Sequence, residues 1–267
     1  MLIIGERING MFKNVREAIQ SKDKGAIQDL ARRQVEAGAS MLDVNVGPAS
    51  DQPQEAMVWL VETIQEAVDV PLSLDSANLD VVRVGLEARE GRKSLINSTT
   101  GHQEKLDQYF PLAKEYNASL IGLTIDESGV PSTVDGRVEI AMKILAAALE
   151  HEFPLEELYI DPIVLPVNVA QDQCPHILQA LSQFQILSDP PPHTVVGLSN
   201  VSQRCQERSL INRTYLVMCM AHGLDAAIVD PLDKNLMDAM ITAELLLNKN
   251  IYCDSFLEAY RKSMAAG

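Results

Sequence analysis

Residues 2–6 of the chain read LIIGE, a short apolar run that ends on a carboxylate. Seven further runs are built in the same way, because each is apolar, strand-like and closed by an acid, an amide or a hydroxyl. Their ends lie roughly 22 to 39 residues apart, which leaves room for a loop and one helix between successive strands. The seven runs are MLDVN at 41–45, LSLD at 72–75, SLIN at 94–97, LIGLT at 120–124, LYID at 158–161, TVVGLSN at 194–200 and AAIVD at 226–230.

The segments between these runs have helical periodicity. Over 57–68, apolar side chains recur at every third or fourth position from Met57 to Val68, and glutamates occupy the other face. This segment is therefore predicted to form a helix that covers the strands. Similar patterns predict further helices over 23–37, 79–89, 102–116, 135–151, 173–188, 211–222 and 235–248.

Alternating strands and helices are typical of two architectures, a closed barrel and an open, doubly wound sheet. An open sheet of this size usually carries a phosphate-binding turn such as G-x-G-x-x-G or G-x-x-x-x-G-K-[ST], and the chain contains neither. No Gly/Ser-rich linker or low-complexity tract divides the sequence. We therefore predict an α/β fold with a single (β/α)8 TIM-barrel domain over residues 1–267.

Composition and charge disfavour several classes of function. A formal net charge of −15 disfavours nucleic-acid binding, which needs a basic surface to neutralise phosphates. The four cysteines show no C-x-x-C spacing and no secretory leader precedes the first strand, so we expect a cytoplasmic protein. No apolar run approaches the roughly 20 residues that span a bilayer, so we expect no membrane segment.

If the strands are parallel, their polar ends gather at one mouth of the barrel. Carboxylates accept hydrogen bonds and side-chain amides offer both acceptors and donors, so this ring suits a flat, polar heterocycle. The ring holds no lysine or cysteine, which disfavours Schiff-base and thiol chemistry, and the histidines form no H-x-H or H-x-x-x-H pair, so we predict no metal site. Each polar end could instead cap the helix that follows it. The ring residues are Asp43, Asp75, Asp161, Asp230, Asn45, Asn97 and Asn200.

Several of these strand ends resemble a known family. The motifs LIIGERING at 2–10, LDVNVG at 42–47, LDS at 74–76, INS at 96–98, IDP at 160–162 and GLSNVS at 197–202 resemble the pterin-binding barrels. That family includes dihydropteroate synthase, the folate domain of methionine synthase and corrinoid methyltransferases. The stretches YIDP at 159–162, PVNVAQD at 166–172, GLSNVSQ at 197–203 and LINRT at 210–214 look closest to the methyltetrahydrofolate:corrinoid/iron–sulfur protein methyltransferases. The resemblance runs from residue 1 to about residue 261.

The resemblance implies a pterin site at the mouth. Asp75, Asn97 and Asp161 match the family's ligands of the pterin ring, and Asn200 matches the amide that contacts the ring near the methylated nitrogen. A reduced pterin carries adjacent N–H groups that suit a carboxylate, which pairs with them bidentately. By the resemblance we assign Asn200 and Asp75 to catalysis. The remaining pterin-site candidates are Glu6, Asn9, Gly197, Ser199, Ser202 and Arg208.

Two of these assignments have alternatives. Asn9 could instead cap the segment that follows the first strand. Arg208 lies on the loop predicted after the seventh run, where either Arg208 or Arg204 could meet the benzoyl-glutamate carboxylate of a folate, or Arg208 could remain solvated. Gly197 and Ser199 would let the seventh strand approach the ring closely.

The implied reaction moves the methyl group of 5-methyltetrahydrofolate to the cobalt(I) of a corrinoid, in the acetyl-CoA pathway of carbon fixation. The D-x-H-x-x-G pattern of cobalamin-binding modules is absent, so we expect the corrinoid (cobalamin) on a separate corrinoid/iron–sulfur protein. That partner would dock over the mouth, against rim loops near 9–14, 45–54 and 202–209. The resemblance also implies a homodimer.

Two other functions remain open. A dihydropteroate synthase-like enzyme needs basic residues for a diphosphate, yet the eighth run continues as the acidic turn VDPLD at 229–233. A folate-binding module without turnover is the second alternative, and a turnover assay separates it from an enzyme.

Overall fold

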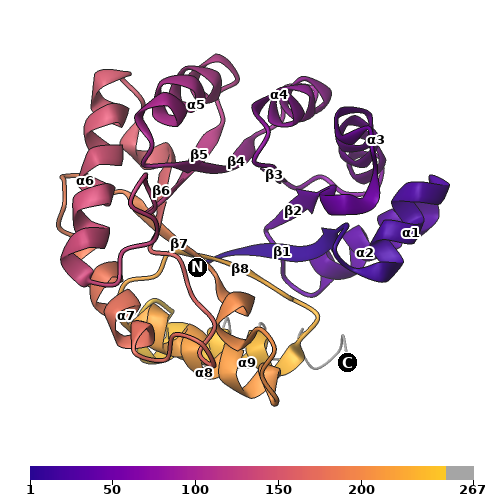
Figure 1. Ribbon diagram of the computed structural model, residues 1–267. Helices are drawn as coiled ribbons and strands as arrows, with labels where there is room; N and C mark the ends of the chain where they lie inside the picture. The colour runs from indigo at the N-terminus through magenta and orange to yellow at the C-terminus, as the bar shows by residue number, and fades with distance from the viewer. Residues whose placement is uncertain (251–267) are drawn as a thin grey trace.

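A computed structural model describes residues 1–250, so the last part of the predicted 1–267 domain lies outside the described residues. Eight parallel strands pair in sequence order, and β1 pairs with both β2 and β8, which closes a barrel (Figure 1). The predicted (β/α)8 barrel is therefore confirmed. The strands are β1 (Leu2–Asn9), β2 (Met41–Asn45), β3 (Leu72–Asp75), β4 (Ser94–Thr100), β5 (Ser119–Leu123), β6 (Leu158–Asp161), β7 (His193–Gly197) and β8 (Ala226–Val229).

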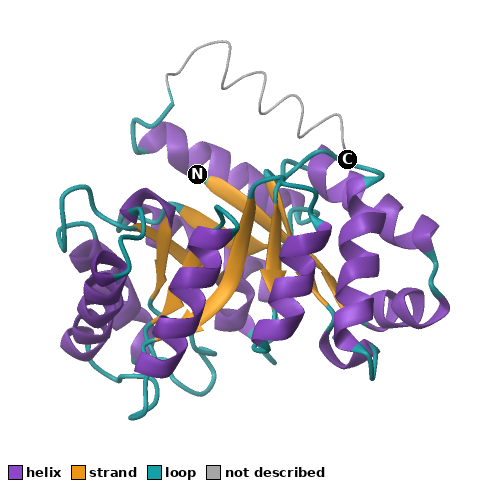
Figure 2. Cartoon of the chain, turned by 90° about the horizontal axis from the view of Figure 1, so that it is seen from above, coloured by secondary structure: helices purple, strands orange, loops and turns teal. Residues whose placement is uncertain are grey.

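Helices surround the strands on the outside of the barrel (Figure 2). Each predicted helix overlaps an observed one, because an apolar stripe at helical spacing needs the outer face of the sheet to bury it. Over the described range, no helix combines the length and hydrophobicity that crossing a bilayer requires. The helices are α1 (Lys13–Ser21), α2 (Lys24–Glu36), α3 (Pro53–Gln65), α4 (Leu79–Ala88), α5 (Gln103–Glu115), α6 (Val134–Glu150), α7 (Gln173–Phe184), α8 (Arg208–Ala221) and α9 (Lys234–Leu246), with 3-10 turns η1 (Gly47–Ala49), η2 (Leu155–Glu157) and η3 (Leu198–Ser202).

Helix α1 was not predicted, and the rim segment expected as a loop over 9–14 includes its first residues. Val15, Ala18 and Ile19 form its buried face, at the i, i+3, i+4 spacing of a helix. The pattern is short, because this helix covers only 9 residues. Helices of this length depend on tertiary packing rather than on propensity, which is why the sequence signal is weak.

The interior of the barrel is layered. Side chains of alternate strand residues point inward, and the inner layer distant from the mouth is apolar. Two residues further along β1, β2 and β4, the inward positions are Glu6, Asp43 and Asn97. The barrel therefore changes from apolar to polar toward the carboxyl ends of its strands. The apolar layer consists of Ile4, Met41, Leu95, Ile121, Val195 and Ala226.

Gly10 holds two rim segments together at the end of β1. Its N–H donates to the carbonyl oxygen of Asn45 at 2.9 Å. A Cβ at Gly10 would lie 1.9 Å from the carbonyl oxygen of Val46, which is backbone and cannot rotate away.

Gly10→Ala should therefore force the backbone of this rim apart and lower the free energy of unfolding by about 1–3 kcal/mol. Gly25→Ala in α2 is the control, because its Cβ would meet only Asp23 Oδ1 at 3.4 Å. Alanine is favoured there by up to about 1 kcal/mol over glycine. Urea denaturation of both variants measures the difference, and equal stability of Gly10→Ala and the parent protein would refute the packing argument.

Candidate active site

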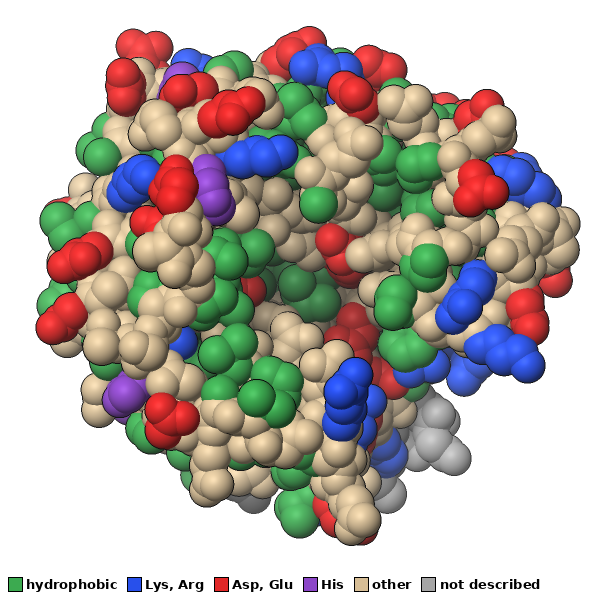
Figure 3. Space-filling model, in the orientation of Figure 1, with side chains coloured by type: hydrophobic (Ala, Val, Ile, Leu, Met, Phe, Trp, Pro, Cys, Tyr) green, Lys and Arg blue, Asp and Glu red, His purple; other side chains and the backbone are tan. Residues whose placement is uncertain are grey.

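The space-filling view shows a hollow at the centre of the molecule, with acidic side chains inside it (Figure 3). On one side of the hollow, carboxylates and amides of β2, β3 and β4 bond to one another. Asp43 Oδ1 accepts from Ser73 Oγ at 2.7 Å and from Asn97 Nδ2 at 3.0 Å. Asn45 Nδ2 donates to Asp75 Oδ2. Asp75 and Asn97 are register partners on β3 and β4, so the sheet itself brings them together.

Two carboxylates in this network compete for one proton. Asp43 is only 3% exposed, and its burial raises the pKa of its carboxyl well above the usual value, with the charge of Asp75 raising it further. Burial also raises the pKa of Asp75, while the hydrogen bond from Asn45 opposes this rise. Two like charges this close do not both ionise readily. We assign the proton to the deeper Asp43, which leaves Asp75 as the carboxylate that faces the mouth.

Asp161 ends β6 on a different side of the barrel. It is 7% exposed, and its Oδ1 accepts the backbone N–H of Ile163 at 2.7 Å. Burial raises the pKa of Asp161 to about 7, although backbone N–H groups of Ile163 and Gly197 favour the ionised form. The buried position of Asp161 is thus a poor environment for its charge. A ligand that donates hydrogen bonds to the carboxylate would stabilise it.

This burial should make the stability of the protein depend on pH. The pKa of Asp161 is raised in the folded state. The contribution of Asp161 to the stability is therefore greatest below its unfolded-state pKa near 4, and it is lost as the pH rises to about 7. Asp161→Asn removes the charge and keeps an acceptor for Ile163. From pH 4 to 8 the variant should therefore gain roughly 2–4 kcal/mol relative to the parent protein. Denaturant titrations at several pH values measure this gain, and parallel curves for the two proteins would contradict it.

The prediction that Asn200 ends the seventh strand is wrong. Strand β7 ends at Gly197, and the 3-10 turn η3 begins at Leu198. Leu198 and Val201 are buried, and they fix the turn against the core. Asn200 itself is exposed at the mouth. Its amide lies over Gly197, because a Cβ at that glycine would come 3.1 Å from Asn200 Nδ2.

The end of η3 is supported by an arginine from the next helix. Arg208 is the first residue of α8 rather than part of a loop, which corrects the sequence-based expectation. Its Nε donates to Ser202 Oγ at 3.1 Å, and its Nη2 donates to the carbonyl oxygen of Ser199 at 3.3 Å. Ser202 is fully buried, so we assign it to holding this turn rather than to contacting a ligand.

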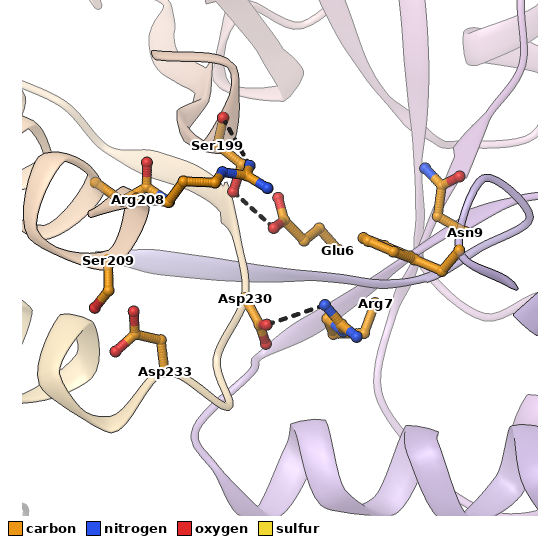
Figure 4. Close-up of a pocket in the computed structure, with 10 residues that line it drawn as sticks. Glu6, Arg7, Asn9, Ser199, Arg208, Ser209, Asp230 and Asp233 are labelled. Atoms are coloured by element: carbon orange, nitrogen blue, oxygen red, sulfur yellow. Dashed lines mark hydrogen bonds and ion pairs between the residues drawn. The ribbon is translucent and has the colours of Figure 1, made fainter. Parts of the chain in front are cut away.

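A cavity of about 280 Å³ lies between the ends of β1 and β8, η3 and the start of α8 (Figure 4). Glu6 and Ser199 point toward each other across it, and Ser199 Oγ donates to Glu6 Oε1 at 2.7 Å. Arg7 forms an ion pair with Asp230 at 3.3 Å. The cavity is thus lined by both positively and negatively charged side chains. Its lining residues are Glu6, Arg7, Asn9, Phe12, Ser199, Arg208, Ser209, Asn212, Asp230 and Asp233.

The structure divides the predicted site residues into two groups. Glu6, Asn9, Ser199 and Arg208 line the cavity. The predicted residues that do not line it are Asp75, Asn97, Asp161, Gly197, Asn200 and Ser202. Asn9 also accepts the backbone N–H of Met11 at 2.9 Å, so it turns the chain as well as facing the cavity.

Sequence reasoning missed other members of the site. Asp43 was placed in the polar ring but was not given a role. Arg7 and Asn212 were not predicted as site residues, and Phe12 was covered only by the predicted docking rim over 9–14. The two-residue alternation from Ile4 to Glu6 and from Met41 to Asp43 is the signal that places these two acids inside the barrel. No comparable pattern marks Asn212, which reaches the cavity from α8. Within residues 1–250, no group of three or more His, Cys, Asp or Glu residues is arranged to hold a metal ion.

The fold and the site define a parallel (β/α)8 barrel with a polar site at the carboxyl ends of its strands, the usual place of catalysis in such barrels. Residues 9–230 match a protein-family model described as pterin binding enzyme. The chain belongs to this family, and the resemblance seen in the sequence is confirmed.

Curated relatives narrow the comparison. A methylcorrinoid:tetrahydrofolate methyltransferase of Eubacterium limosum is 30% identical over 264 residues, which cover 98% of this chain and 97% of that protein. A methionine synthase of Mycobacterium leprae is 29% identical over 242 residues. That match covers 86% of this chain but only 20% of the methionine synthase.

Solved structures agree on the fold. A dihydropteroate synthase of Yersinia pestis, with a pterine–sulfa conjugate, aligns with a TM-score of 0.68 and 16% identity, over 93% of this chain and 94% of that one. A dihydropteroate synthase of Coxiella burnetii, in complex with pteroic acid, has a TM-score of 0.67 and 14% identity, with 91% and 93% covered. At this identity the likeness concerns the barrel and not the reaction.

Proposed function

We propose that the protein transfers a methyl group between N5 of a reduced folate and the cobalt of a corrinoid carried by a separate protein. The observation that carries the proposal is the match over 98% of the chain to a methylcorrinoid:tetrahydrofolate methyltransferase. That relative's name makes the corrinoid the methyl donor, whereas the sequence-based prediction made 5-methyltetrahydrofolate the donor. One set of residues serves both directions, because forward and reverse reactions share a transition state.

The carboxylates fit a pterin. In this proposal Asp75 and Asp161 pair with the N–H groups of the pterin ring, and the network around Asp43 holds Asn97 and Asp75 in place. The proton on Asp43 keeps the charge of the pocket low enough for Asp75 to remain ionised. Burial deprives these carboxylates of hydrogen bonds from water, and the N–H groups of the ligand would supply hydrogen bonds in their place. Ligand binding and ionisation of the carboxylates therefore favour each other.

Asn200 is the proposed electrophilic group. The departing or attacking nitrogen of the folate changes its charge during transfer, and an amide N–H placed near it stabilises that change. Asn200 is an exposed residue in the middle of η3 and its amide lies over Gly197, and in this proposal the amide reaches a pterin that is bound by Asp161. The glycine leaves room for both the amide and the ring.

The cavity disfavours the dihydropteroate synthase alternative. A diphosphate needs lysines and arginines that face it, but Glu6, Asp230 and Asp233 line this part of the mouth together with only two arginines. A diphosphate at this place would meet three carboxylates. Methyl transfer between a folate and a corrinoid has no diphosphate substrate, so the acids of the cavity are compatible with that reaction.

The turnover test uses free cobalamin. Incubation of 5-methyltetrahydrofolate with cob(I)alamin should produce methylcobalamin, followed by absorbance, only in the presence of the protein. The reverse mixture of methylcobalamin and tetrahydrofolate should lose methylcobalamin. Absence of transfer in both directions, with folate binding intact by calorimetry, would leave a binding module and overturn the enzyme assignment.

A more specific proposal concerns the protein that carries the corrinoid. We propose that the physiological corrinoid protein is a corrinoid/iron–sulfur protein of the acetyl-CoA pathway, that it docks over the mouth, and that the enzyme is a cytoplasmic homodimer. The purified protein should then contain neither cobalt nor an iron–sulfur chromophore. Methyl transfer to a corrinoid/iron–sulfur protein should be faster than transfer to a corrinoid protein without a cluster, and the opposite order would overturn this choice of partner. Sedimentation analysis tests the dimer.

A further inference from the structure

The proposed methyl transfer requires a proton for N5 of the folate, and none of the residues assigned so far supplies it. When a methyl group leaves N5 of a folate as a cation equivalent, the nitrogen keeps the electron pair and must gain a proton. Asn200 cannot supply it, because an amide N–H does not ionise in this range. A group with an acidic proton, near the mouth and not already paired with the pterin, is required.

Glu6 occupies such a position. It is the inward-facing acid of β1, it lines the cavity, and its Oε1 accepts a hydrogen bond from Ser199 Oγ at 2.7 Å. Ser199 directly precedes Asn200 in η3, and Arg208 holds the Ser199 carbonyl oxygen at 3.3 Å. The Ser199 hydroxyl is therefore held at the Glu6 carboxyl group (Figure 4), and Asn200, which is proposed to contact the reacting nitrogen, is the next residue in the chain.

The charges around Glu6 keep a proton available near neutral pH. The pKa of Glu6 is raised to about 7, mainly by burial and also by the nearby charge of Asp230. Arg7 and Arg208 and the hydrogen bond from Ser199 act in the opposite direction. Asp43 faces Glu6 from β2, and the N-cap residue of α9, Asp233, lines the same cavity. Two cations thus face three other carboxyl groups around Glu6.

We propose that Glu6 stores the proton exchanged with the folate nitrogen and passes it through the hydroxyl of Ser199. This inference rests on the proposed methyl transfer. In the direction toward cobalt, the C–N bond breaks, N5 takes a proton from Ser199, and Ser199 takes the proton of Glu6, which becomes a carboxylate. The methyl group forms its new bond with the electron pair of cobalt(I). In the reverse direction Glu6 accepts the proton that N5 of tetrahydrofolate loses, so no further reactant is needed.

The pterin-facing acids are less suited to this role. Asp75 and Asp161 would pair with N–H groups of the bound pterin, which holds them ionised in the complex. Asp43 accepts hydrogen bonds from Ser73 and Asn97 and does not line the cavity. Only Glu6, among these buried acids, lines the cavity. Titration of Asp75 and Asp161 should therefore affect folate affinity, whereas titration of Glu6 should affect the rate in the saturated complex.

The test is stopped-flow methyl transfer from saturating 5-methyltetrahydrofolate to cob(I)alamin between pH 6 and 8.5. The parent protein should slow as pH rises through about 7, because Glu6 loses its proton. Glu6→Gln, which keeps an acceptor for Ser199, should transfer at least about tenfold more slowly at pH 6 and should lose this pH dependence. Its folate dissociation constant should change by less than about threefold. The reverse reaction of the parent protein should instead accelerate as pH rises.

Two further variants separate proton transfer from structural support. Asp230→Asn removes a charge that raises the pKa of Glu6, so it should keep the pH-dependent step and move it to lower pH. Ser199→Ala should flatten the profile, and Ser199→Thr should restore it by returning a hydroxyl. The Ser199 pair also decides the matter if Glu6→Gln does not fold.

The possible failures are distinguishable. Absence of transfer by the parent protein at every pH overturns the proposed function itself. Normal transfer by the parent protein, with an unchanged pH profile in Glu6→Gln or in Ser199→Ala, overturns only the proton route.

Discussion

Asp75→Ala is expected to weaken the binding of 5-methyltetrahydrofolate by about 30- to 1,000-fold, or roughly 2–4 kcal/mol. The substitution removes a charge-assisted pair from a partly buried pocket, and it leaves Asn45 Nδ2 without its partner. Isothermal titration calorimetry of the variant measures the loss. An unchanged dissociation constant would mean that the pterin binds elsewhere at the mouth.

The loss should not come from unfolding. Asp75 and Asp43 repel each other when ionised, so removal of Asp75 relieves the electrostatic strain on its neighbour and brings the pKa of Asp43 closer to its usual value. Asp75→Asn is the sharper variant, because it preserves the size of the side chain and an acceptor for Asn45. It should still bind folate at least about tenfold more weakly, since an amide cannot replace a bidentate carboxylate. Asp69→Ala, at a carboxylate whose side chain is 93% exposed, serves as the control and should leave binding unchanged.

Much of the barrel can be predicted from the sequence because it depends on local patterns. Strand ends such as LSLD at 72–75 and LYID at 158–161 match the observed strands β3 and β6 to the residue. The closed order of the strands then follows from their number and spacing. Asp75 and Asn97 are brought together by this architecture alone, because neighbouring parallel strands end at the same rim.

The rest of the site depends on contacts between distant segments. Glu6 and Ser199 are 193 positions apart, and no periodicity connects the end of β1 with the turn after β7. The run TVVGLSN at 194–200 is apolar enough to suggest a strand through Asn200, but burial of Leu198 and Val201 stabilises a 3-10 turn instead. Ser202 similarly appears as a polar mouth residue in the sequence, although the turn buries it under Arg208. Side-chain burial of this kind is set by tertiary packing.

Asn200→Ala is expected to lower the rate of methyl transfer by roughly 100-fold or more, the loss typical of one preorganised donor at a developing charge. Folate binding should weaken by only about tenfold or less, because a neutral amide interacts modestly with the ground state. The backbone of η3 should remain, since the carbonyl oxygen of Asn200 still accepts from Gln203 N. Single-turnover stopped-flow measurements at saturating folate isolate the rate from the affinity.

The pH profile gives this prediction its second readout. Asn200 is exposed and its amide lies over Gly197, whereas Glu6 and Ser199 bond to each other without it. Asn200→Ala should therefore be slower at every pH while retaining the pH dependence of the parent protein, the reverse of the pattern expected for Glu6→Gln. Gln108→Ala, which removes an exposed amide from the outer helix α5, is the control for both variants. If Asn200→Ala transfers methyl at the parent rate under saturation, Asn200 only binds the pterin, and the electrophilic role must belong to another group at the mouth.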